Sequence, residues 1–259
     1  MVKRVLNIIV GKEKIMANNT RFTTEQLVGR FEDRRDIKNL MGKYVVSILL
    51  KKERTMFANF WSKKDDICLG VNEGYYQGPA VIKNYYKTID KYTAATRDLL
   101  VKLFPKETAG KTPEQLYGIG PFEDRCINNA VIEIAADGNT AKGMWASLGN
   151  VTDVTTRGPV SHWVCATFAA DFIREDDKWK IWHLLYLEDV RSPAGHNWSE
   201  GKNPYPELPE FAPMAAVAMP LPNVKKVLRE RYTKDRPFAK LPRIPEPYNT
   251  FADTFTYGI

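Results

Sequence analysis

The stretch from Asp171 to Val190, DFIREDDKWKIWHLLYLEDV, decides the fold of this chain. Two runs rich in aromatic and branched residues flank the polar turn 175–177, a pattern that predicts a β-hairpin. Side chains alternate across a strand, so one face of the second arm should be apolar with a single polar member. That face is expected to carry Trp179, Ile181, His183, Leu185 and Leu187. The His183 imidazole is then either a satisfied core group or a titratable group in a pocket.

The other segments place this hairpin at the end of an α+β domain. Apolar residues recur at helical spacing up to about Lys52 and again from Pro79 to Leu103, with a short helix expected over 53–61. Strands are expected at 65–70, 75–76, 127–135, 140–148, 162–173 and 179–190. Consecutive long strands favour antiparallel pairing. The order of elements therefore predicts a curved, mostly antiparallel sheet wrapped around N-terminal helices.

Three parts of the chain are expected to differ in character. We predict an N-terminal extension over 1–31, a folded domain over 32–191 with an irregular insertion at 104–126, and an arm over 192–259. Eleven of the 16 prolines fall in this arm, so it cannot form a core of its own. Its many aromatic residues argue against free disorder. We expect it to wrap over the domain or a neighbouring subunit, with one helix at 223–234.

Composition limits the classes of function. The chain of 259 residues is 44% hydrophobic and can bury a core. It has no apolar run of the roughly 18 residues that cross a bilayer, and the apolar run at 5–10 is too brief for a secretory signal. Three cysteines without Cys-x-x-Cys spacing argue against disulfides and zinc, which favours the cytoplasm. The net charge of +7 is spread among 31 acidic residues, so we expect neither nucleic acid nor a membrane as partner.

Three motifs carry a family resemblance. They are YxGxxxIxxYY at Tyr76–Tyr86, IEIAADGNTAKGMW at Ile132–Trp145 and DDKWKIWHLLYLEDV at Asp176–Val190. Together they resemble the SnoaL-like branch of the nuclear transport factor 2-like (NTF2-like) superfamily over about 32–191. The resemblance implies a cone-shaped α+β fold. Its members include polyketide cyclases, ketosteroid isomerases and dehydratases as well as binding modules, so the fold alone does not settle the function.

The resemblance also implies two catalytic side chains. Tyr44 occupies the first-helix place where isomerase and dehydratase relatives carry a tyrosine that holds an oxyanion, although its spacing also fits simple packing. His183 lies on the final strand, whose concave face lines the pocket, and could transfer a proton. Two carboxylates of the relatives are missing, because Leu49 and Leu69 stand in their places. Proton transfer would then need His183, Tyr44 or an acid such as Asp189 or Glu73.

Further residues are expected to contact a ligand. They are Trp145, Tyr75, Tyr76, Phe168, Arg125 and Asn128. Trp145 either stacks on an aromatic compound or only buries area. Arg125 either binds a phenolate, carboxylate or enolate or makes a surface ion pair. Alternation along the preceding strand favours an inward-facing His162 over an inward-facing Trp163.

These features predict a lyase, dehydratase or isomerase that needs no cofactor and acts on a small hydroxylated aromatic or polycyclic compound. The sequence has no phosphate-binding glycine loop, no dinucleotide fingerprint and no metal-binding motif. A non-catalytic module that binds a hydrophobic metabolite and an assembly protein stay open as alternatives. The apolar face expected to carry Trp182, Leu184 and Tyr186 predicts a homo-oligomer, either a dimer or a trimer.

Overall fold

The computed structural model describes residues 22–50, 53–112, 115–116, 122–155, 158–200, 217, 219–235 and 242–259. Most of the predicted N-terminal extension lies outside these residues, as do parts of the predicted insertion and of the predicted arm. Among the described residues, no helix combines the length and the apolar character that crossing a membrane would require.

Helices precede and interrupt the sheet. They are α2 (Thr24–Leu49), α3 (Glu53–Phe60), α4 (Pro79–Leu103) and the single turn α5 (Pro105–Thr108). A capping box starts α2, because the Thr23 hydroxyl accepts from the Gln26 backbone N–H while the Gln26 side chain accepts from the Thr23 N–H. Helix α2 thus begins before the predicted domain boundary at residue 32. Pro79 occupies the first turn of α4, where its missing N–H costs nothing.

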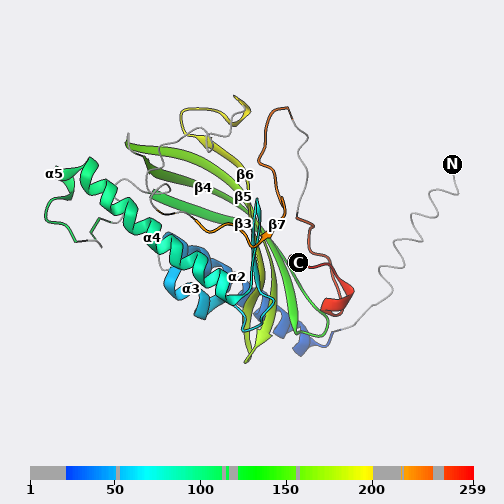
Figure 1. Ribbon diagram of the computed structural model, residues 1–259. Coiled ribbons are helices and arrows are strands. Elements are labelled where there is room, and N and C mark those ends of the chain that lie inside the picture. Colours follow the sequence, from blue (N-terminus) through cyan, green and yellow to red (C-terminus); the bar gives the residue numbers. More distant parts are fainter. Residues whose placement is uncertain are drawn as a thin grey trace.

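In the described part of the chain, seven strands form one sheet in the order β3-β4-β5-β6-β1-β2-β7. Their bounds are β1 Cys68–Val71, β2 Gly74–Gln77, β3 Phe122–Ile134, β4 Thr140–Thr155, β5 Gly158–Glu175, β6 Lys178–Pro193 and β7 Val224–Lys225. Strands β1 and β6 run parallel, and every other neighbouring pair is antiparallel. The prediction of a curved, mostly antiparallel sheet with N-terminal helices is confirmed. Figure 1 shows α4 and α5 on one side of the sheet and the C-terminal residues, in red, on the other.

Strand β6 contains one extra residue opposite β5. Asp171 pairs with His183, but Phe172 pairs with Ile181, so Trp182 has no partner of its own. Such a bulge shifts the alternation by one residue. The prediction that Ile181 and His183 share a face is therefore wrong, because His183 follows the bulge.

The two faces of the sheet can be defined from these pairs. Residues opposite one another in antiparallel strands project to the same side. The inner face, which packs against α2, carries Trp145, Phe168, Phe172, Ile181 and Leu184. The outer face carries Lys142, Ala169, Asp171, His183, Leu185 and Leu187. Most of the buried apolar residues lie on the inner side, where Ile37 and Met41 of α2 are fully buried.

The described arm lies along the sheet in two pieces. In the first, Val224 and Lys225 pair with Tyr75 and Gly74 of β2, and the next residues are irregular. The helix predicted at 223–234 is wrong, because its backbone N–H groups bond to the sheet edge instead: that of Leu228 donates to the Asn72 carbonyl oxygen at 2.8 Å. The second piece, 242–259, covers the outer face.

Candidate functional site

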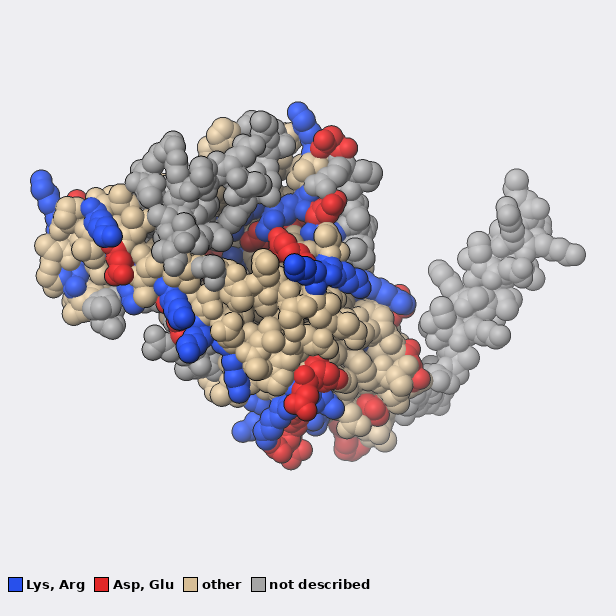
Figure 2. Space-filling view, in the orientation of Figure 1, with Lys and Arg blue, Asp and Glu red and all other residues tan. Residues whose placement is uncertain are grey.

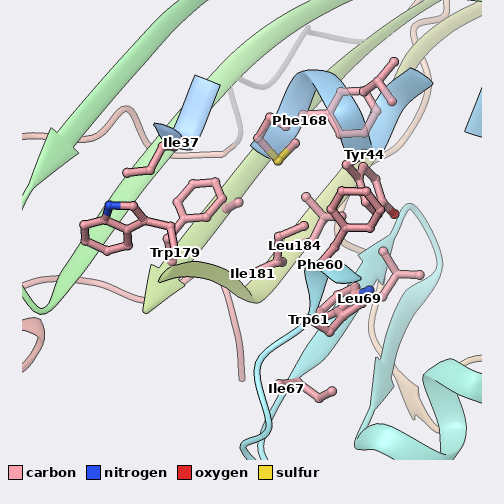
Figure 3. Close-up of a cluster of buried hydrophobic side chains, with 14 of the residues drawn as sticks. Ile37, Tyr44, Phe60, Trp61, Ile67, Leu69, Phe168, Trp179, Ile181 and Leu184 are labelled. Carbon is pink, nitrogen blue, oxygen red and sulfur yellow. The ribbon is translucent and has the colours of Figure 1, made fainter. Parts of the chain in front are cut away.

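Tyr44 lies inside the packed core of the inner face. Its ring is 3% exposed and meets the edge of Phe60 with centroids 5.6 Å apart. Its hydroxyl is 3.0 Å from the Tyr86 hydroxyl, which also accepts from the Trp61 indole N–H at 3.1 Å. Figure 3 shows Tyr44 among Phe60, Leu184 and other apolar side chains. These contacts are those of a packed core tyrosine whose hydroxyl is hydrogen-bonded.

His183 lies on the outer face beneath the arm. Its Nδ1 is 2.8 Å from Asp171 Oδ2, and its ring stacks on Trp182 with centroids 4.7 Å apart. A Cβ on Gly258 would come within 2.7 Å of the imidazole, so the chain end presses directly on the ring. The ring is 5% exposed. His183 and Tyr44, which the family resemblance assigned to one catalytic site, lie on opposite sides of the sheet, because the bulge at Trp182 turns the imidazole to the outer face.

Asp171 holds the arm to the sheet. Its Oδ2 accepts from the Tyr257 backbone N–H at 2.8 Å and from the Thr256 hydroxyl at 3.0 Å, in addition to its contact with His183. Its Oδ1 accepts from Lys142 Nζ at 2.5 Å, and both side chains of this ion pair are fully buried.

Lys142 is surrounded by the aromatic residues of the arm. Desolvation lowers the pKa of its ammonium group, while the nearby Asp171 carboxylate opposes this shift. Four rings lie within cation–π distance of the ammonium nitrogen, which is 4.5 Å from one of the centroids. These rings belong to Tyr248, Phe251, Phe255 and Tyr257. The buried ion pair of Lys142 and Asp171 on the outer face is thus covered by residues 248–257 of the arm.

A second group of ionisable side chains lies on the inner face. We call it the arginine–tyrosine cluster and define it as Glu123, Arg125, Tyr186, Glu188 and Arg191. Arg125 Nε donates to Glu123 Oε1 at 2.7 Å, and Arg125 Nη1 donates to the Tyr186 hydroxyl oxygen. The Tyr186 hydroxyl donates to Glu188 Oε1 at 3.2 Å, which also accepts from Arg191 Nη1 at 3.1 Å. Basic and acidic side chains meet in Figure 2 over the region of β6 and β7.

The local structure explains why these residues meet. Arg125 lies opposite Gly149, and a Cβ there would come within 3.1 Å of Arg125 Cγ, so the glycine leaves room for the guanidinium stem. On β6, Glu188 pairs with Ala166 and Val190 with Cys165, which makes Asp189 a second extra residue. This bulge brings Glu188 and Arg191 to the same face.

Aromatic rings lie next to the cluster. Phe168 and Tyr186 have centroids 4.9 Å apart, and the Arg125 guanidinium lies 4.8 Å from the centre of the Tyr186 ring. From α4, Tyr85 packs on Tyr76 at 4.6 Å. Burial raises the pKa of the Tyr85 phenol, and the positive charge of Arg125 partly offsets this rise. Tyr76, Arg125 and Phe168, three of the predicted ligand-contacting residues, therefore belong to one region.

The remaining predicted site residues lie elsewhere. Trp145 packs in the core against Phe172, with centroids 6.1 Å apart. Tyr75 belongs to the buried outer-face group, and Asn128 is exposed. Asp189 forms an ion pair with Arg229 at 2.5 Å and accepts from the hydroxyl of Thr167, an outer-face residue. The structure thus separates these four residues from the arginine–tyrosine cluster.

Parity along β5 was predicted correctly. His162 is 1% exposed, whereas Trp163 is 44% exposed. The sequence reasoning missed the other members of the cluster, which are Glu123, Tyr186, Glu188 and Arg191; the unrecognised bulge assigned Tyr186 and Glu188 to the other side. One signal was present: three charged residues, Glu188, Asp189 and Arg191, follow directly on the apolar run of β6 and are largely buried. Within the described ranges, no group of three or more His, Cys, Asp or Glu side chains is arranged to hold a metal ion.

Comparison with known proteins identifies one family. The model of the SnoaL-like domain matches residues 29–184, which is more than half of the chain. The resemblance predicted from the three sequence motifs is confirmed. A search of curated protein sequences returned no match.

Solved structures offer distant likenesses. A hexachlorocyclohexane dehydrochlorinase, LinA type 2, has a TM-score of 0.46 at 17% identity, covering 66% of this chain and 96% of its own. LinA type 3 from Novosphingobium barchaimii LL02 gives 0.45 at 17% identity, with the same coverage of 66% and 96%. A putative scytalone dehydratase from Novosphingobium aromaticivorans DSM 12444 gives 0.46 at 10% identity, covering 65% and 92%. At these values the likeness says nothing about the reaction or substrate of this chain.

Proposed function

The chain belongs to the family of SnoaL-like domains, and we propose that it is a lyase or isomerase that moves protons on a small aromatic compound. The observation that carries the proposal is the chain of hydrogen bonds from Arg125 through Tyr186 to Glu188 on the inner face. Proton transfers alone balance such a reaction, so it requires no electron acceptor.

Tyr186 is the proposed acid–base group. A phenol has one proton and two lone pairs. The proton points to Glu188 and one lone pair accepts from Arg125, which leaves one lone pair for a proton from the substrate. As that proton arrives on the Tyr186 oxygen, the tyrosine's own proton passes to Glu188. The Arg125 guanidinium stabilises any negative charge that develops on the phenol oxygen.

The return step decides the reaction class. Glu188 gives its proton back to Tyr186, which delivers a proton either to a different carbon of the substrate or to a leaving group. The first outcome is an isomerisation, and the second is an elimination. Atoms and electrons balance in both cases, because one proton leaves the substrate and one returns.

Aromatic substrates fit the surroundings of the cluster. The Arg125 guanidinium lies over the Tyr186 ring, which packs on Phe168, and Tyr85 packs on Tyr76 in the same region. Offset or edge-on ring contacts stabilise a bound aromatic by about 0.5–1.5 kcal/mol each beyond burial. The proposed substrate is therefore a small aryl ketone or hydroxylated aromatic compound.

Deuterium uptake from solvent tests the proposal without knowledge of the natural substrate. A panel of aryl ketones and hydroxylated aromatics is incubated with the protein in D₂O, and deuterium at carbon is measured by mass spectrometry. At least one compound should exchange faster with protein than without it. Tyr186→Phe should lower that rate by about 100-fold, because positioned acid–base groups contribute roughly 10²–10⁴-fold.

The matched control makes the same chemical change on the other face. Tyr75 is a buried tyrosine of the outer-face group, and Tyr75→Phe should leave the exchange rate unchanged. Equal rates in wild-type protein and Tyr186→Phe would refute the acid–base role.

A binding role without chemistry has one observation in its favour. Glu188 already accepts hydrogen bonds from Tyr186, Arg191 and twice from Arg231, which limits its capacity to take up a further proton. An aromatic compound that raises the melting temperature and exchanges no deuterium would favour this second function.

A further inference from the structure

Glu188 is held by a residue from the C-terminal arm. The family match covers residues 29–184, so Tyr186 and Glu188 follow it closely, whereas Arg231 lies 43 residues beyond Glu188. Arg231 donates to Glu188 Oε2 from Nε at 3.1 Å and from Nη2 at 3.0 Å. The other carboxylate oxygen accepts from Tyr186 and Arg191. The arm therefore fixes the group that accepts the Tyr186 proton.

The arm segment that carries Arg231 is itself fastened by Asn72, in the turn between β1 and β2. The Asn72 side-chain amide donates to the carbonyl oxygens of Glu188 at 2.8 Å and Arg229 at 3.2 Å. Its side-chain oxygen accepts from the Glu188 backbone N–H at 2.9 Å. Its backbone oxygen accepts from the Leu228 N–H at 2.8 Å. One buried asparagine thus joins the arm and the site strand.

The bulge residue of β6 is bound to the same segment. The Tyr232 backbone N–H donates to the Asp189 carbonyl oxygen at 2.7 Å, and the Arg229 guanidinium forms an ion pair with the Asp189 carboxylate at 2.5 Å. The bulge is what places Glu188 and Arg191 on one face. Residues 228–232 therefore stabilise both the backbone and the side chains of the site.

We propose that Arg231 is a positioning residue of the site, supplied by the arm, and that it fixes the Glu188 carboxylate against Tyr186. Its catalytic consequence rests on the proposed function, whereas its effect on the geometry does not. Two parallel N–H donors bind one carboxylate oxygen in a fixed orientation, which a lysine ammonium cannot reproduce. Without them, the carboxylate can rotate about its last bond and lose the Tyr186 hydroxyl. A displacement of about 1 Å at a reacting group can cost roughly 100-fold in rate.

The test compares three full-length variants. Arg231→Met removes the positive charge and both N–H donors to Glu188. Arg231→Lys keeps the charge but lacks the paired donors of the guanidinium. Arg243→Met is the control, because Arg243 lies in the same arm, is 65% exposed and pairs with Glu246 at 3.6 Å. Each protein is labelled with ¹³Cζ-tyrosine, and the Tyr186 resonance is assigned by its absence from Tyr186→Phe. This resonance reports the hydrogen bonding of the phenol without any ligand.

The expected result is a shifted Tyr186 resonance in Arg231→Met, a smaller shift in Arg231→Lys and no shift in Arg243→Met. On a compound that exchanges deuterium, the rate should fall by about tenfold or more in Arg231→Met with only partial loss in Arg231→Lys. If Arg231→Met does not fold, the Tyr186 resonance of Arg231→Lys is compared with those of the wild type and Arg243→Met, and this comparison decides.

An unmoved Tyr186 resonance in both Arg231 variants would overturn the proposal, whatever the exchange rates. A loss of stability alone, with this resonance unchanged, would also overturn it, since a merely structural residue behaves in that way. A shifted resonance in a protein that exchanges no deuterium on any compound would support the positioning role and refute the proposed function instead.

Discussion

The ion pair between Lys142 and Asp171 should be the most sensitive point of the fold. Asp171→Asn leaves a fully buried ammonium without its counter-ion and puts an amide N–H₂ group among donors. Removing one partner of a buried pair costs about 3–5 kcal/mol. For a domain of this size that loss corresponds to a melting temperature lower by roughly 10 °C.

The reciprocal change should cost less. In Lys142→Met the Asp171 carboxylate keeps three donors, from His183, Thr256 and the Tyr257 backbone. We expect a loss of about 1–3 kcal/mol, in the range of a hydrogen bond to a charged group. The double variant should be less destabilised than the sum of the single variants, with a coupling energy of at least about 1 kcal/mol.

Guanidinium chloride unfolding, followed by circular dichroism, measures these free energies. Hydrogen exchange at the Tyr257 amide reports release of the arm, and it should accelerate in Asp171→Asn. Asp98→Asn, on the exposed surface of α4, is the control and should change neither quantity. The reasoning is refuted if Asp171→Asn loses less than about 1 kcal/mol, the scale of an ordinary exposed ion pair, or if Lys142→Met loses more than Asp171→Asn.

Three further predictions concern other buried groups of the fold. Gly258→Val should press on the His183 ring and lower the unfolding free energy by about 1–3 kcal/mol, as overpacking does. Gly195→Val is the control, because a side chain there meets open space. Limited proteolysis should therefore cut the arm faster in Gly258→Val than in Gly195→Val. Tyr44→Phe should lower the unfolding free energy by about 0.5–1.5 kcal/mol through its lost hydroxyl contact and leave deuterium exchange unchanged; a large loss of exchange would restore a catalytic role. Burial raises the pKa of both β2 tyrosines, Tyr75 and Tyr76, to about 12. The stability that they contribute is therefore full below a pH of about 10 and is lost as the pH rises to about 12, so the unfolding free energy should be lower at a pH of about 11, within this window, than at a pH of about 9, below it.

Secondary structure was predictable where the local sequence pattern is strong, either as apolar residues at helical spacing or as a polar turn between two runs rich in aromatic and branched residues. The helix expected from Pro79 to Leu103 has those bounds, and the hairpin in 171–190 is confirmed. The helix expected at 223–234 failed for a different reason. The sequence of this segment does not show that Asn72 and the edge of β2 lie beside it. Backbone hydrogen bonds to these distant residues replace the hydrogen bonds that a helix would make within the segment.

The side on which His183 lies could not be predicted from alternation. The arm covers the outer face, so both faces of β6 carry buried apolar residues, and the buried His183 does not show which face is turned to solvent. A bulge is then invisible in the pattern, and an error of one residue reverses every later assignment. This single error hid Tyr186 and Glu188; of the residues expected to contact a ligand, Tyr76, Arg125 and Phe168 lie in the same region of the structure.

The extra residue at Trp182 has a consequence for how this strand tolerates change. Many substitutions along β6 keep each later side chain on its own side, and their effects stay local. Loss of Trp182 itself would remove the bulge and leave Ile181 opposite Phe172 and His183 opposite Asp171, whereas loss of a paired residue such as Leu185 would move every later side chain of β6 to the other face. In this hairpin, one missing paired residue should therefore do more harm than several altered ones.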